Sequence, residues 1–177
     1  MARLRWFDRR FDFSFPPELF PELLERLRGT PLRLAERVSH LEPEAQRRRI
    51  AGWSVQEHAG HLADLDRILF RPRFLEFERG ESTLLAADLS NATTERADHN
   101  ARSMDAVLAE ERRERAAMIA HLEAMNPELV ARTALHPRLN VPMRLVDLML
   151  FVAEHDDHHL ASITELTRDL TGRSDGP

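Results

Sequence analysis

The amino-acid sequence predicts an all-α protein, and a four-helix bundle is the simplest arrangement of its elements. Its 177 residues suit a single domain with one core. Four segments of roughly 25–30 residues carry apolar side chains at helical spacing, and strand signals are few. We therefore expect one helical domain over residues 1–177, with residues 1–16 as an extended segment that lays aromatic side chains on the core.

Capping signals mark the first two helices. Residues 17–41 form one helical pattern that is broken at Gly29 and restarts at once, with a threonine N-cap followed by a proline. The second helix begins at a capping box made by Ser54 and Glu57, in which each residue satisfies a backbone N–H of the other. Its apolar stripe continues to Arg79, where a glycine ends it.

The remaining chain predicts two more helices and two connections. Residues 81–93 are a crossover loop, and residues 94–125 are a long third helix that an Asn-Pro pair ends. Residues 127–141 are irregular in pattern. The last helix is expected to start at Pro142, because proline suits the first helical turn, and to stop at Gly172.

Composition excludes several classes of protein. With no cysteine and no lysine, the chain has no thiolate metal site, cysteine nucleophile, Schiff-base lysine or Walker phosphate loop. No GxGxxG stands in the sequence, and the net charge of −5 argues against a nucleic-acid partner. No apolar run is long enough to span a membrane, and the first residues lack the apolar segment of a signal peptide, so we expect a cytoplasmic protein without a membrane partner.

The last helix carries a histidine pair that suggests a metal site. His155 and His159 lie one turn apart on the apolar stripe of that helix. Two imidazoles in a core repel one another if protonated and lack partners if dry. A divalent metal removes both problems by accepting both lone pairs. The spacing also arises by chance in a chain with nine histidines, so a purely structural pair is the alternative.

A third histidine completes a candidate triad. His61 begins the apolar stripe of the second helix, and facing helices of a bundle are a usual place for metal sites. Three histidine ligands leave at least one open position, which is typical of a catalytic metal. Asn100 is a candidate substrate-binding residue near the mouth of a pocket, and Arg96 or Arg144 could bind an anionic substrate. Four acidic residues could orient the ligands, although we expect most of them to be solvated: Glu57, Asp64, Asp156 and Asp157.

These residues resemble the DinB-like superfamily, in its DinB/YfiT-like metalloenzyme branch. The resemblance covers most of the chain and rests on WSVQE at 53–57, GHL at 60–62 and EHDDHHL at 154–160. It implies a four-helix bundle of up-down-down-up order and a divalent metal held by three histidines, which fall on His61, His155 and His159. Zinc is the metal it implies first, with nickel as the alternative.

The resemblance leaves two hypotheses about function. Relatives of this kind resemble metal-dependent hydrolases or S-transferases that use low-molecular-weight thiols, so the first is an enzyme that acts on a small molecule with a metal-activated water or thiol as nucleophile. The alternative is a non-catalytic metal-binding or structural helical bundle with a dimerising or stress-related role. An exposed helix face would in either case allow a homodimer.

Overall fold

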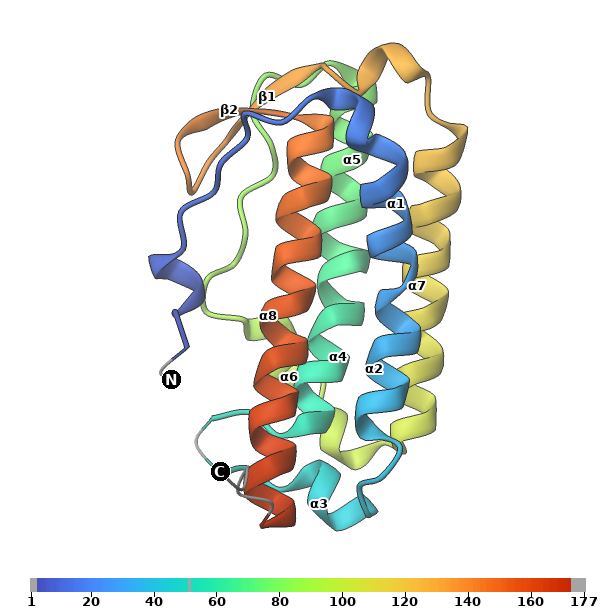
Figure 1. The fold of residues 1–177 in the computed structure, drawn as a ribbon, viewed down its shortest axis with the longest axis vertical. Helices are drawn as coiled ribbons and strands as arrows, with labels where there is room; N and C mark the ends of the chain where they lie inside the picture. The colour runs from blue at the N-terminus through green and yellow to red at the C-terminus, as the bar shows by residue number, and fades with distance from the viewer. Residues whose placement is uncertain (1–2, 51, 173–177) are drawn as a thin grey trace.

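Long helices packed side by side form the body of the molecule in the computed structural model, which describes residues 3–50 and 52–172. Figure 1 shows these helices standing roughly parallel, with short elements at both ends and along one side. The long elements are α1 (Phe20–Arg28) with α2 (Thr30–Val38), α4 (Val55–Leu65) with the π-helical turn η3 (Asp66–Phe70) and α5 (Arg71–Arg79), α7 (Met104–Ala124), and α8 (Leu145–Thr171). The short elements on the first part of the chain are η1 (Trp6–Asp8), η2 (Pro17–Leu19) and α3 (Pro43–Arg47).

The first two predicted helices are confirmed. The first is divided at Gly29 into α1 and α2, as expected, although α2 ends at Val38. At the start of α4, the hydroxyl of Ser54 accepts a hydrogen bond from the backbone N–H of Glu57, and the Glu57 carboxylate accepts one from the backbone N–H of Ser54. Gly80 ends α5 in the left-handed region, with φ of 76°, which glycine adopts without steric cost.

The third helix starts later than the sequence pattern predicts. Residues 92–101 form the short helix α6 (Ala92–Arg96) and the 3₁₀ turn η4 (His99–Ala101), and α7 begins only at Met104. Asp98 has φ of 46°, which a continuous helix does not allow. Ser103 then caps α7 by accepting a hydrogen bond from the N–H of Ala106. The interruption places the His99 side chain against α4.

A β-hairpin replaces the irregular segment expected before the last helix. After η5 (Pro127–Leu129), strand β1 (Thr133–His136) pairs antiparallel with β2 (Val141–Arg144). The prediction that Pro142 starts the helix is wrong, because Pro142 lies in β2 opposite Leu135. The helix starts instead after Arg144, whose backbone N–H donates to the carboxylate of Asp147. A proline suits this two-stranded sheet, where a missing N–H donor is tolerated at an edge.

Three segments outside the helices cover one side of α8 and α4. They are residues 3–16, the connection 81–91 and the hairpin, and Figure 1 shows them along the same side of the bundle. Leu84 donates its N–H to the carbonyl of Leu135, which ties the connection to β1. Trp6 and Phe11 in the N-terminal segment contact the ring of Phe151 with centroid distances of 5.1 Å. These segments wall the cavity described below.

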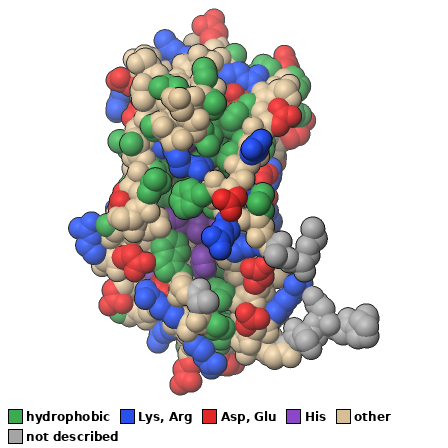
Figure 2. Space-filling model, turned by 90° about the vertical axis from the view of Figure 1, so that its left-hand side faces the viewer, with side chains coloured by type: hydrophobic (Ala, Val, Ile, Leu, Met, Phe, Trp, Pro, Cys, Tyr) green, Lys and Arg blue, Asp and Glu red, His purple; other side chains and the backbone are tan. Residues whose placement is uncertain are grey.

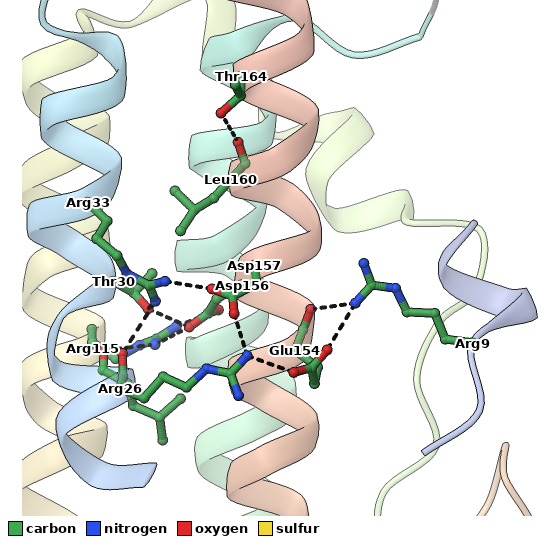
Figure 3. Close-up of polar contacts among 11 residues, drawn as sticks. Arg9, Arg26, Thr30, Arg33, Arg115, Glu154, Asp156, Asp157, Leu160 and Thr164 are labelled. Atoms are coloured by element: carbon green, nitrogen blue, oxygen red, sulfur yellow. Dashed lines mark hydrogen bonds and ion pairs between the residues drawn. The ribbon is translucent and has the colours of Figure 1, made fainter. Parts of the chain in front are cut away.

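A buried ion-pair network joins the helices on the opposite side of α8. The guanidinium of Arg115 donates to both carboxylate oxygens of Asp66 (2.6 and 3.2 Å), to both of Asp156, and to the carbonyl of Leu27 (3.2 Å). All five N–H groups of Arg115 are therefore used. The hydroxyl of Thr30 also donates to Asp156 (2.8 Å), and Figure 3 shows how this network continues to the surface of α8. In the described part of the chain, no helix is both long and apolar enough to cross a bilayer.

Candidate metal centre

Three buried histidines from two helices meet at one point. His61 comes from α4, and His155 and His159 come from successive turns of α8. One ring nitrogen of each lies within 4.8 Å of those of the other two, and each residue is 3–6% exposed. The structure thus brings together the three residues predicted as ligands. Helical geometry explains the pair on α8, since residues four apart project from one face.

The donor set fits a divalent cation. His155 Nε2 and His159 Nε2 are 3.1 Å apart, and two ligands about 2.1 Å from a tetrahedral zinc ion are about 3.4 Å apart. Nδ1 of His155 is buried and has no hydrogen-bond partner among the described residues. Burial lowers the pKa of His61 to about 3 and lowers those of His155 and His159 well below the ordinary value. All three rings are therefore neutral near pH 7, with lone pairs available for a metal.

A buried chain of polar groups orients His61. Nδ1 of His61 donates to the hydroxyl of Thr94 (2.9 Å), and that hydroxyl donates to Asp64 (3.1 Å). Asp64 also accepts from Nε2 of His99 (2.9 Å). Burial would raise the pKa of Asp64, but these hydrogen bonds lower it below the ordinary value. This arrangement leaves Nε2 of His61 free for a ligand role, as in histidine metal sites held by a carboxylate.

Gly60 allows this chain of hydrogen bonds to form. A Cβ atom at Gly60 would lie 2.3–2.4 Å from ring atoms of His99, far inside van der Waals contact. The ring of His99 therefore reaches Asp64 only because residue 60 has no side chain. This close approach explains why a glycine stands inside helix α4, where its low helix propensity alone would disfavour it.

Aromatic and histidine rings surround the triad. Nδ1 of His58 lies 2.8 Å from Nδ1 of His159, so His58 can accept a hydrogen bond from the N–H that a metal-bound His159 would carry on that nitrogen. The indole of Trp53 lies 4.6 Å from the ring of His61, and that of Trp6 lies 5.1 Å from the ring of His155, measured between centroids. These contacts fix the rings by packing on two sides.

The triad lies in the wall of a cavity of about 170 Å³. Figure 2 shows histidine side chains at the bottom of a hollow between hydrophobic and arginine side chains. The bundle and the three covering segments both contribute to the lining, which contains Trp6, Phe7, Trp53, His61, Leu65, Leu69, Phe70, Arg73, Ala87, Asp88, Leu89, Asn91, His136, Arg138, Phe151, His155, His158 and His159. A small molecule in this cavity would therefore contact the histidine cluster directly.

Comparison with protein families decides the relationship. The model of the DinB superfamily matches residues 20–163. The chain belongs to the DinB superfamily. Among solved structures it is similar to YfiT from Bacillus subtilis, described as a probable metal-dependent hydrolase with an unusual four-helix bundle topology. The two chains share 23% identity over 94% of this chain and 95% of that one, with a TM-score of 0.75, which supports a fold of the same kind. No protein of curated function matches the chain.

In this DinB superfamily chain, one of the four candidate carboxylates supports a predicted ligand through a hydrogen-bonded intermediary. Asp64 is linked to His61 through the hydroxyl of a threonine. Glu57 instead accepts the capping hydrogen bond from the N–H of Ser54 and forms an ion pair with Arg49. Asp156 and Asp157 point away from the triad into the arginine network of Figure 3. The view that most of these groups are solvated is wrong for Glu57, Asp64 and Asp156, which are buried.

The polar residues predicted near the substrate lie elsewhere. Oδ1 of Asn100 accepts a hydrogen bond from the hydroxyl of Ser54 (2.8 Å), and Asn100 does not line the cavity, so its substrate-binding role stays a prediction. Arg96 is exposed, and Arg144 pairs with Asp147. Neither arginine lines the cavity.

Sequence reasoning assigned no site role to four polar residues near the cavity that lie outside the long helices. These are Thr94 and His99 behind His61, and His136 and Arg138 on the hairpin. The motif of histidine followed by proline and arginine at 136–138 was the available signal for the last two. However, the sequence pattern did not predict the hairpin, so it did not place residues 136–138 beside the histidine triad.

Proposed function

We propose that this chain is a divalent-metal-dependent enzyme that acts on a small molecule. His61, His155 and His159 would hold the ion, and the cavity would admit the substrate. The observation that carries the proposal is the convergence of three buried, neutral imidazoles in the wall of a cavity. A purely structural site would be closed, whereas this one borders space large enough for a ligand.

Zinc is the metal that we propose, with nickel as the alternative. Neutral imidazoles are suitable ligands for both, and the protein offers no thiolate that would favour a softer metal. Three histidine ligands and an open position are typical of catalytic zinc sites. When bound, the cation supplies a Lewis acid that lowers the pKa of a water or a thiol near it.

We propose that the nucleophile comes from outside the chain, because the described residues that line the cavity include no serine, threonine, cysteine or lysine. The sequence has neither cysteine nor lysine to attack a substrate. Water is the nucleophile that the description of YfiT favours, since that relative is named a probable metal-dependent hydrolase. A low-molecular-weight thiol is the second candidate, which would make the enzyme an S-transferase.

The protein's own residues would hold the ligands in place. Asp64 and Thr94 fix the tautomer of His61, and His58 accepts from His159, so both ligand rings have defined orientations. Trp6 and Trp53 shield the cluster from bulk water on two sides. Exclusion of water strengthens every charge interaction inside the cavity.

We also propose that the bundle has the helix order of the family, because that order places the long connection beside the cavity. We propose the up-down-down-up arrangement because the connection from α5 to α7 is long and runs along the outside of the bundle in Figure 1. Such a connection carries the chain from one end of a bundle to the other, so that two successive helices run in the same direction. It also supplies a wall of the cavity.

Metal analysis of protein purified without a histidine tag tests the proposal. We expect one zinc or nickel ion per chain in the wild type and a loss of most of it in His155→Ala. The matched control is His40→Ala, since His40 is exposed and outside the cluster. Undiminished metal in His155→Ala would refute the proposed site. A screen of ester, amide and thiol-transfer substrates with the metal-loaded protein then distinguishes hydrolysis from thiol transfer.

A further inference from the structure

Arg138 reaches the cavity from the turn of the β-hairpin. Its guanidinium carbon lies 5.7 Å from the ring centroid of Trp6, 5.3 Å from that of Phe7 and 5.6 Å from that of Phe151. These three aromatic rings hold the planar guanidinium by cation–π contact. Nη2 of Arg138 is buried and has no hydrogen-bond partner among residues 3–50 and 52–172.

The charge of Arg138 has no counter-charge in the described part of the chain. No carboxylate there forms an ion pair with it, and burial alone lowers its pKa from the ordinary value. The cavity's acidic lining residue is Asp88, whose oxygens accept hydrogen bonds from Ser90 and from the N–H of Ala92. Arg138 is half-buried, and because a buried donor without a partner is costly, its Nη2 is suited to donate to an anion from outside.

Arg73, the other arginine in the cavity wall, is already occupied. Its Nε and Nη2 both donate to the carbonyl of Leu85 (2.9 and 2.7 Å), and its Nη1 faces Nε2 of His136 (3.1 Å). Glu76 also offsets its charge. Arg73 therefore builds the wall, and Arg138 is left as the one guanidinium of the described lining with a free buried donor.

The cavity limits the size and chemistry of the anion. Its volume of about 170 Å³ is close to the roughly 150 Å³ that holds a benzene molecule in a protein core. Leu65, Leu69 and Phe70 give part of the wall an apolar character. A single free guanidinium matches one carboxylate, and the apolar wall matches a small hydrocarbon body.

We propose that Arg138 binds the carboxylate of a small organic acid whose apolar body lies in the cavity beside the histidine triad. This inference rests on the proposed function for the reaction that follows, but the binding itself does not require the metal. Arg138 and His155 both contact Trp6, so a molecule held by Arg138 lies next to the candidate metal centre. The hairpin would thereby select the substrate, while the helices carry the chemistry.

Isothermal titration with benzoate tests the proposal, using the whole chain both treated with a chelator and loaded with zinc. We expect benzoate to bind both forms, and Arg138→Gln to weaken binding roughly ten- to hundred-fold, the usual range for loss of a charge-assisted hydrogen bond. Arg138→Lys keeps the positive charge but lacks the planar pair of N–H donors of a guanidinium, and it should bind benzoate with intermediate affinity. Arg96→Gln, at an exposed arginine outside the cavity, should bind like the wild type.

Three results would overturn the proposal. Benzoate that binds only the zinc-loaded protein, with equal affinity in Arg138→Gln, would place the anion on the metal. Absence of binding to both forms of the wild type would exclude a carboxylate site. If phosphate binds more tightly than benzoate, the site is not specific for a carboxylate. Metal content, measured on the same samples, separates these results from failure of the metal site, and thermal melts show whether each variant is folded.

Discussion

Replacing Glu111 with glutamine should stabilise the protein at neutral pH. The Glu111 side chain is fully buried in α7, and neither carboxylate oxygen has a hydrogen-bond partner in the described part of the chain. Arg115, one turn along α7, is the cation that most lowers the pKa of Glu111, but all of its donors are taken by Asp66, Asp156 and a backbone carbonyl. Burial raises the pKa of Glu111 to about 8, so the folded protein keeps this carboxyl protonated at pH 7.

The magnitude follows from the difference in proton binding between the folded and unfolded chains. In the unfolded chain Glu111 ionises near its ordinary pKa of 4.5. Its contribution to stability is therefore fullest below pH 4.5 and declines as the pH rises toward 8, because the unfolded chain has already released its proton. At about 1.4 kcal/mol per pH unit, unfolding becomes easier by about 3 kcal/mol at pH 7 and about 5 kcal/mol above pH 8.

Urea denaturation of Glu111→Gln and wild type, with a chelator present at every pH, measures this effect. The two proteins should have similar stability near pH 4.5, and the variant should be more stable by about 3 kcal/mol at pH 7, equivalent to about 6–12 °C in melting temperature. Glu44→Gln, at an exposed position of α3, is the matched control and should show no such dependence. A stability difference that stays constant from pH 5 to pH 9 would mean that Glu111 is ionised and paired, and would refute the reasoning.

The other predictions concern the polar groups around the triad. Gly60→Ala should displace the ring of His99 and weaken zinc affinity about ten-fold, measured by chelator competition; unchanged affinity would show that His99 does not support the site. Asp156→Asn should cost about 3 kcal/mol in urea denaturation, because it removes a partner of buried Arg115, yet it should leave metal content unchanged. The metal-free protein should lose stability as the pH falls below about 6.5, because the unfolded chain takes up protons before six histidines whose pKa values burial lowers (His58, His61, His136, His155, His158 and His159); these six groups outweigh the opposite effect of the single carboxyl of Glu111, and a urea midpoint that rises on acidification from pH 6.5 to pH 5 would contradict this.

Local signals explain why the helices were predictable. The capping box at Ser54, the break at Gly29 and the left-handed glycine at Gly80 act within a few residues, so the sequence alone contains them. The pair His155 and His159 is equally local, because a helix places residues four apart on one face. These elements therefore follow from spacing without knowledge of the rest of the fold.

Contacts between distant segments explain what the sequence did not predict. The strands β1 and β2 are four residues each, too short for a clear alternation, and Pro142 is typical of a helix start as well as of an edge strand. The late start of α7 depends on the backbone of Asp98. As a consequence, the positions of Arg138 and of His99 relative to the triad could not be read from periodicity.

The positions of the two tryptophans should make intrinsic fluorescence a probe of the histidine triad. The chain contains only Trp6 and Trp53, and both indoles touch rings of the histidine triad. Intrinsic emission should therefore respond to occupancy of the centre without any label. A paramagnetic ion such as nickel should quench this light, whereas closed-shell zinc should only shift it, so one fluorescence titration can distinguish the two metals.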